Sequence, residues 1–221
     1  MEQTILTPNQ SLVLEHAAKD PKITDRYYLT GGTALAEFYL RHRISEDIDF
    51  FSEHNVNPLE TNSFVESLKA VLPIKNISLK PISGLFIYTI AFTDGNVLKI
   101  DFNDYDVIPV ESSNLKIGNL RIDSLYDIAI NKVASIMGRS KARDFIDLYF
   151  CIKKEGYTWE QLFGRVEDKF GVSYEETTVV TQFAHVQDVQ DYPTMLVPFN
   201  KEDMINFYLS EAKKLEPKIF K

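Results

Sequence analysis

The sequence contains one cysteine, Cys151, in 221 residues. A single cysteine excludes an internal disulfide framework and any metal cluster held by several thiolates. The sequence also lacks an apolar run near the ~20 residues needed to cross a bilayer. Its first residues, MEQTILTPNQ, lack the charged start and apolar stretch of a signal peptide. We therefore expect a soluble, cytoplasmic protein with no membrane contact.

Positive charge is scarce as well. The chain has 24 Lys and Arg residues against 32 Asp and Glu residues, which gives a formal net charge of −8. This balance excludes a general nucleic-acid coat protein, which would be strongly basic. Any nucleic-acid contact would have to come from a local basic patch, or from metal ions that offset clustered carboxylates. With 44% hydrophobic and 25% charged residues, the composition is that of an ordinary globular protein.

The sequence pattern changes near Asp123. Before it, β-rich runs alternate with helical ones, and after it nearly every segment is helical. The predicted strands are 26–30, 47–51, 74–80, 85–93 and 97–103, and the predicted helices are 8–19, 33–42, 57–72, 124–137, 142–154, 158–170, 174–183 and 201–214. We expect Gly138 and Gly156 to end helices and Ser140 to cap one. The pattern predicts an α+β fold with a small mixed sheet, in which residues 1–122 form the α+β core and 123–221 a helical domain.

Asp47 and Asp49 are the first candidates for chemistry. In a strand over 47–51 they share one face, while Ile48 and Phe50 share the other and are expected to be buried. Two neighbouring carboxylates repel each other unless a cation lies between them, and ligands made only of oxygen suit Mg²⁺. A solvated strand end is the alternative, since Asp-x-Asp alone is common.

Two further features strengthen the metal interpretation. Gly31-Gly32-Thr33 lies between a predicted strand and helix, where glycines let the backbone approach a ligand and the helix N-terminus favours phosphate. An ordinary strand–helix turn is the alternative there. In the strand 97–103, Asp101 points away from the core beside Lys99. A third carboxylate on an adjacent strand is what a two-metal phosphoryl-transfer site requires.

Lys132 and Asp144 are candidates in the helical part. Lys132 falls within the apolar arc of helix 124–137, so it must either extend outward to solvent or reach a buried anion such as NTP phosphate. Asp144 lies near the start of helix 142–154. It either forms ion pairs with neighbouring cations (Arg139, Lys141 or Arg143), acts as a general base, or orients Lys132. For Asp147 we expect a structural salt bridge, for example to Arg143.

Four motifs occur together over about residues 28–150. They are GGTALA at 31–36, HRISEDIDFF at 42–51, INKVA at 130–134 and RSKARDFIDL at 139–148. In this order they resemble the AbiEii/AbiGii-type nucleotidyltransferase toxins of the polymerase-β-like nucleotidyltransferase superfamily. The resemblance implies a polymerase-β-like core whose helical C-terminal domain contributes to the active site.

The resemblance also implies a function and a set of site residues. The expected activity is Mg-dependent transfer of a nucleotide from an NTP to tRNA, with two ions and Mn as a possible substitute. The expected partner is a cognate antitoxin encoded nearby. The site predicted from the residues and the resemblance together comprises catalytic Asp47, Asp49, Lys132 and Asp144; NTP-binding Gly31, Gly32, Thr33, Arg43 and Lys132; and metal-binding Asp47, Asp49 and Asp101.

Two other functions remain open at this point. The same chemistry could modify a small molecule such as an aminoglycoside, since a net charge of −8 suits a cationic substrate better than RNA. The chain could also be a non-catalytic member that serves as a binding partner. RNA binding would depend on local cations, for which the candidates are Arg41, Arg43, Arg139, Lys141 and Arg143, and would weaken steeply with salt.

Overall fold

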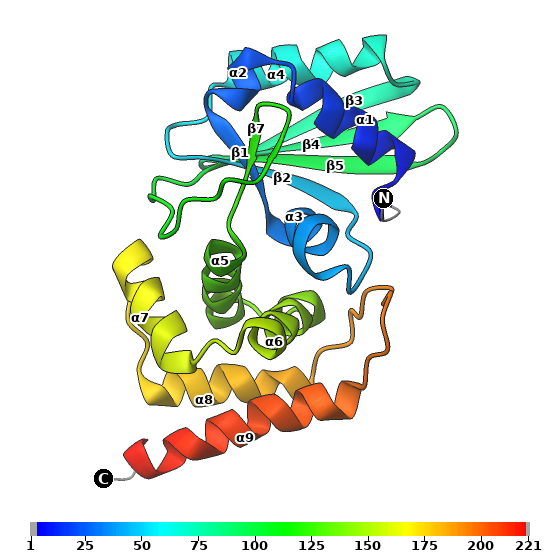
Figure 1. Ribbon diagram of the computed structural model, residues 1–221. Helices are drawn as coiled ribbons and strands as arrows, with labels where there is room; N and C mark the ends of the chain where they lie inside the picture. The colour runs from blue at the N-terminus through cyan, green and yellow to red at the C-terminus, as the bar shows by residue number, and fades with distance from the viewer. Residues whose placement is uncertain (1–3, 220–221) are drawn as a thin grey trace. The chain divides into compact units, whose positions relative to one another are not determined.

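The computed structural model describes residues 4–219, with side chains described as far as residue 215 (Figure 1). The chain divides into two compact units. The first contains the residues up to 39 together with 44–124, and the second contains 40–43 and the residues from 125 onward. No helix within 4–219 has both the length and the apolar character needed to cross a membrane.

A mixed β-sheet forms the centre of the first unit. The strands lie in the order β3-β4-β5-β2-β1-β7-β6. Their bounds are β1 (Tyr27–Thr30), β2 (Asp47–Ser52), β3 (Ile74–Ile82), β4 (Leu85–Phe92), β5 (Val97–Asp104), β6 (Lys116–Ile117) and β7 (Leu120–Ile122). Strand β1 pairs antiparallel with β2 and parallel with β7, and β2 pairs parallel with β5. The predicted α+β fold with a mixed sheet is confirmed.

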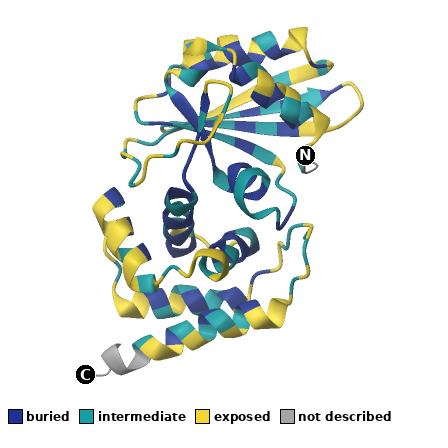
Figure 2. Cartoon of the chain, in the orientation of Figure 1, coloured by how far each residue is buried: buried dark blue, intermediate teal, exposed yellow. Residues whose placement is uncertain are grey.

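One face of the sheet carries the core of this unit. Ile48, Phe50, Ile100 and Phe102 are fully buried, as their alternation with polar residues predicts. Helices α1 (Pro8–Ala17), α2 (Pro21–Thr24) and α4 (Pro58–Ser67), the last extended by a 3₁₀ turn (Leu68–Ala70), lie on this side (Figure 1). The alternation is visible in Figure 2, where buried and partly exposed positions follow one another along the strands.

The helix after β1 differs from the prediction at both ends. It begins at Gly31, as α3 (Gly31–Leu35), and continues as a π-helical turn (Ala36–Leu40). The predicted extension to His42 is wrong because Arg41 adopts a left-handed conformation with φ 51°, which ends the helix. The short hairpin β6–β7 was not predicted, since two strands of two and three residues carry too little alternation to be recognised.

Five α-helices make up most of the second unit as far as the structure describes it, to residue 219. They are α5 (Leu125–Gly138), α6 (Ala142–Glu155), α7 (Trp159–Phe170), α8 (Glu176–Ala184), which is followed by a 3₁₀ turn (His185–Gln187), and α9 (Lys201–Ile219). Gly156 ends α6 in the left-handed conformation, as predicted. Gly138 is the last residue of α5, as predicted, but it does not adopt the left-handed conformation, and the Arg139 amide still donates to the Ser135 carbonyl.

The N-terminus of α6 is capped from a distance. Lys141 occupies the N-cap position, and the backbone amide of Ala142 donates to Oδ1 of Asp191 at 2.9 Å. The prediction that Ser140 caps this helix is therefore wrong. A residue 49 positions away supplies the oxygen that a local Ser was expected to provide.

Candidate active site

Three carboxylates lie on one face of the sheet in the first unit. In the parallel pair β2–β5, Asp49 stands directly opposite Asp101, and Asp47 stands opposite Lys99. On the other side of β2, Thr30 stands opposite Asp49. Directly opposed residues share a face, so Asp47, Asp49 and Asp101 form one cluster on the side away from Phe50. We call this cluster the carboxylate row.

Lys99 lies between two members of the carboxylate row. Its Nζ atom is 3.3 Å from Oδ2 of Asp101 and 3.6 Å from Oδ2 of Asp47. Burial disfavours the charged lysine, but the attraction of these carboxylates outweighs it and raises the pKa of Lys99. The space between Asp47 and Asp101 therefore stabilises a positive charge.

The turn after β1 is packed directly against the carboxylate row. Gly31 has φ 73°, and a Cβ atom placed on it would lie 2.2 Å from Oδ2 of Asp49. The hydroxyl of Thr33 donates to the backbone carbonyl of Asp47. Gly31 and Thr33 thus hold the turn against β2, and the requirement for glycine comes from both its backbone conformation and its contact with Asp49. Their predicted contact with phosphate, and that of Gly32, stays a prediction.

Replacing Gly31 with Ala is expected to displace Asp49. The left-handed conformation alone costs an L-residue about 1–2 kcal/mol, and the clash with the carboxylate adds to this. Gly95→Ala is a matched control, because Gly95 has φ 89° but a Cβ there would meet nothing within 4 Å. We expect both variants to melt at lower temperature, and only Gly31→Ala to lose tenfold or more in the rate of the nucleotide transfer that the resemblance implies. Equal rates in the two variants would mean that the close packing of Gly31 against Asp49 is not needed for activity.

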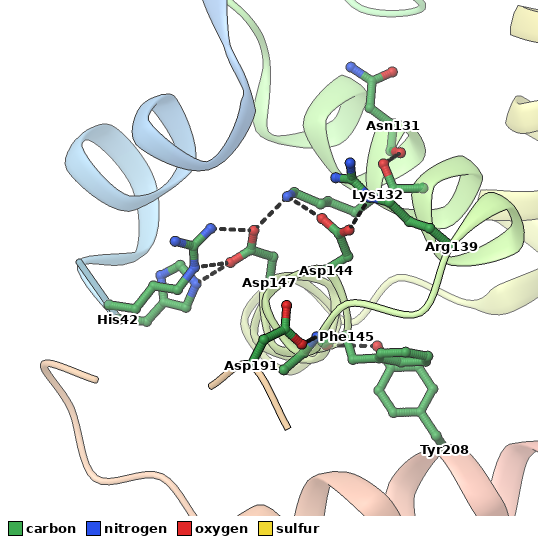
Figure 3. A network of polar contacts seen from close by, with 12 residues as sticks. His42, Asn131, Lys132, Arg139, Asp144, Phe145, Asp147, Asp191 and Tyr208 are labelled. Atoms are coloured by element: carbon green, nitrogen blue, oxygen red, sulfur yellow. Dashed lines mark hydrogen bonds and ion pairs between the residues drawn. The ribbon is translucent and has the colours of Figure 1, made fainter. Parts of the chain in front are cut away.

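A second cluster, within the second unit, is centred on Lys132 (Figure 3). The Lys132 Nζ atom lies 2.8 Å from Oδ1 of Asp144 and 2.7 Å from Oδ2 of Asp147. The residue is only 7% exposed. Lys132 therefore reaches buried anions, which was one of its two predicted placements, and the anions seen here are protein carboxylates. Burial opposes its charge, but the two carboxylates prevail and raise the pKa of Lys132.

Asp147 is the most highly connected member of this cluster. Its Oδ1 atom accepts from Nε of Arg43 at 2.6 Å and lies 2.8 Å from Nε2 of His42, while Oδ2 accepts from Nη2 of Arg43 at 2.8 Å. Burial favours the neutral acid, but Arg43 and Lys132 hold the pKa of Asp147 well below its usual range. The expected structural salt bridge is present, with Arg43 and Lys132 as partners.

Arg43 is placed differently from the prediction. It was expected to face a triphosphate and to belong to a basic surface, but it is only 3% exposed and its guanidinium contacts Asp147 through two hydrogen bonds. Arg–carboxylate pairs of this two-bond type are strong and geometrically specific. Arg43 therefore does not belong to an exposed cationic surface, and its contacts fit a role in positioning the buried cluster.

Asp144 is also buried and ion-paired. Its Oδ1 atom accepts from Lys132, and its Oδ2 atom accepts from Nε of Arg139 at 2.8 Å. Burial raises the pKa of this carboxyl, but Lys132 and Arg139 outweigh that effect and leave it lowered. A carboxylate with a lowered pKa is a weak proton acceptor at neutral pH, so the geometry favours the orienting role for Asp144 over the general-base role.

The structure thus places the predicted residues in two clusters. Gly31, Gly32, Thr33, Asp47, Asp49 and Asp101 belong to the first unit, and Arg43, Lys132 and Asp144 to the second. The sequence pattern did not indicate a role for His42 or the central position of Asp147. No local signal could have identified them, because Arg43 and Asp147 are 104 positions apart. The sequence pattern also indicated no role for Lys99 beyond its position beside Asp101.

Comparisons with known proteins agree with these motifs. The family model described as "Nucleotidyl transferase AbiEii toxin, Type IV TA system" matches residues 12–205. An uncharacterized protein of Aquifex aeolicus (strain VF5) is 27% identical over 171 residues, which cover 76% of this chain and 78% of the relative.

Two solved structures have the same fold. A candidate nucleotidyltransferase from H. pylori aligns with TM-score 0.62 and 23% identity, over 95% of this chain and 92% of that one. MenT4, a nucleotidyltransferase toxin from Mycobacterium tuberculosis H37Rv, aligns with TM-score 0.51 and 15% identity, over 93% and 84% of the two chains. The family model spans most of the sequence, including all four motifs, and the chain accordingly belongs to the AbiEii nucleotidyltransferase toxin family and is a nucleotidyltransferase.

Proposed function

We propose that this nucleotidyltransferase uses two Mg²⁺ ions, with Mn²⁺ as a substitute, to transfer a nucleotide from an NTP to tRNA. The observation that carries the proposal is the carboxylate row, in which Asp49 and Asp101 face each other across two parallel strands and Asp47 lies two residues before Asp49. Three carboxylates on one rigid support are the protein's usual contribution to two-metal phosphoryl transfer.

The donor atoms of the carboxylate row fit a hard divalent cation. Mg²⁺ takes one or two carboxylates and fills its other positions with water and phosphate oxygens. Among the side chains described, which run from residue 4 to residue 215, no group of three or more His, Cys, Asp and Glu residues is placed so that it could hold a metal ion. The cationic Lys99 between Asp47 and Asp101 nevertheless marks a place that favours positive charge. When bound, the metal ions would polarise the phosphoryl group and activate the attacking oxygen.

Other residues of the chain are proposed to hold the NTP. Gly31, Gly32 and Thr33 start α3 beside the carboxylate row, where backbone amides can donate to phosphate oxygens. Binding of the NTP phosphates by Lys132 stays a prediction, because its ammonium group pairs with Asp144 and Asp147 in the structure. Arg43 is proposed to position the buried cluster and not to bind phosphate, because Asp147 accepts two of its hydrogen bonds.

The biological setting is proposed from the family. Its description places it in a type IV toxin–antitoxin system, and MenT4 is described as a nucleotidyltransferase toxin. We propose that the chain acts in the cytoplasm as the toxin of such a pair and that a cognate antitoxin counteracts it. The proposed tRNA acceptor must be bound by local cations, since the whole chain carries a net charge of −8.

Incubation of the protein with labelled NTPs and Mg²⁺ tests the acceptor. We expect label to appear on total tRNA, to disappear when the metal is chelated, and to fall as salt increases. A panel of aminoglycosides serves as the alternative acceptor. Label found only on a small molecule would overturn the tRNA assignment. An absence of NTP-dependent Mg²⁺ or Mn²⁺ binding in calorimetry would overturn the proposed two-metal site.

A further inference from the structure

A cavity of about 250 Å³ opens on the carboxylate side of the sheet in the first unit. Its wall includes Tyr28, Glu53, Ser112, Ser113, Arg121 and Asp123. Tyr28 of β1 stands opposite both Phe51 of β2 and Arg121 of β7. Tyr28, Phe51 and Arg121 thus form a second row of side chains, which runs parallel to the carboxylate row.

The cavity lies next to the carboxylate row. Tyr28 is two residues before Thr30, which stands opposite Asp49. At a rise of about 3.3 Å per residue, the two rows are separated by roughly 7 Å. Asp123, another wall residue, accepts a hydrogen bond from the Thr30 hydroxyl at 2.6 Å. A group bound in the cavity is therefore about one sugar unit away from a phosphate bound at Asp49.

The charge and size of the cavity limit what it can bind. Glu53, Glu111 and Asp123 contribute three carboxylates against the single guanidinium of Arg121. This excess of negative charge disfavours phosphate and favours a neutral group with N–H or O–H donors. The volume is below the roughly 300–1,000 Å³ that a drug-sized ligand occupies, so a multi-ring aminoglycoside is too large.

Arg121 provides a flat surface for such a group. Its guanidinium lies over the Tyr28 ring, 5.6 Å from the centroid, and both of its terminal nitrogens lie 3.3 Å from Oε1 of Glu53. These contacts hold the guanidinium in one orientation. The side chain is still 42% exposed and lines the cavity. Arginine planes held in this way are surfaces on which nucleobases stack.

We propose that this cavity binds the base of the donor NTP. The base stacks on the guanidinium of Arg121, and Glu53 and the hydroxyls of Ser112 and Ser113 form hydrogen bonds with the edge of the base. The inference rests on the proposed function, because it takes the triphosphate to bind beside the carboxylate row. It adds a site for the nucleoside and names Arg121 as the residue through which the enzyme distinguishes an NTP from a bare triphosphate.

Calorimetric titration with Mg²⁺ and either ATP, GTP, CTP, UTP or inorganic tripolyphosphate tests the inference. For wild-type protein we expect at least one NTP to bind tenfold or more tightly than tripolyphosphate. Arg121→Ala should reduce this advantage to threefold or less and leave tripolyphosphate affinity unchanged. Arg26→Ala is the matched control, because Arg26 is similarly exposed at 36% and pairs with Glu60 at 3.4 Å in the same unit. The control should retain the full advantage.

The possible outcomes separate this inference from the proposed function. If wild type binds every NTP no more tightly than tripolyphosphate, the base site is refuted and the proposed triphosphate site stands. If Arg121→Ala weakens tripolyphosphate as much as the NTPs, Arg121 is a phosphate ligand and the base site is again refuted. If wild type binds neither ligand with Mg²⁺, the proposed function itself fails. Matched melting temperatures of Arg121→Ala and Arg26→Ala show that both variants are folded.

Discussion

The Asp49→Asn variant is expected to keep its fold and to lose roughly 10²–10³-fold in the rate of nucleotidyl transfer. A loss of this size is typical when one preorganised electrostatic group is removed from an active site. Asparagine has nearly the same shape as aspartate and fits against Gly31, but it removes the negative charge that faces Asp101. The initial rate of label transfer from an NTP measures the loss. The melting temperature checks that the fold is retained.

Asp25→Asn controls for a loss of negative charge elsewhere in the same unit, since Asp25 is exposed just before β1. Its transfer rate should match that of wild type. Asp101→Asn should also be impaired, by tenfold or more, if the third carboxylate takes part in metal binding. Wild-type activity in Asp49→Asn would refute the proposed metal site, and wild-type activity in Asp101→Asn would remove Asp101 from it.

The carboxylate row was predictable because its causes are local. Alternation along β2 places Asp47 and Asp49 on one face, and the same alternation along β5 places Asp101 outward. The register that brings Asp49 opposite Asp101 is not encoded by either strand alone. It depends on how the two strands pair in the finished sheet, so the sequence indicated three outward carboxylates and the structure showed which of them are direct neighbours.

The buried cluster was only partly predictable, because most of its contacts join segments that lie far apart in the sequence. The position of Lys132 within an apolar arc indicated that a cation lies inside the second unit, but nothing near it in sequence identified its partners. His42 and Arg43 reach Asp147 across about a hundred residues. The cap that Asp191 provides for α6 also comes from a distant segment. Contacts of this kind follow from tertiary packing, which overrides local preferences such as that of Ser140 for a helix N-cap.

Removing the Asp147 carboxylate is expected to cause a large loss of stability in the second unit. Arg43 and Lys132 contact Asp147 in a fully buried setting, and Asp147→Ala leaves both with one fewer counter-charge. Breaking a buried ion pair by deleting one partner costs about 3–5 kcal/mol, because the remaining charge stays buried without compensation. Urea unfolding, followed by the circular dichroism of the helices, measures the change in the free energy of unfolding.

The pH dependence of stability gives an independent test of the same ion pairs. The pKa of Asp147 is lower in the folded protein than in the unfolded chain, so the folded state binds fewer protons at this group. Its contribution to stability is therefore complete above the unfolded pKa of about 4 and is lost as the pH falls through the folded pKa. Asp147→Asn should be destabilised at pH 7 and should lose less stability than wild type on acidification.

Asp168→Ala serves as the control for Asp147→Ala, because Asp168 forms an exposed ion pair with Arg165 one turn away on α7. Exposed pairs of this type contribute little, since water and salt screen them, and no measurable destabilisation is expected. Equal stability of Asp147→Ala and Asp168→Ala would mean that the Asp147 cluster is solvated or rearranged in solution. A large loss confined to Asp147→Ala would instead show that the buried ion pairs around Lys132 stabilise the second unit.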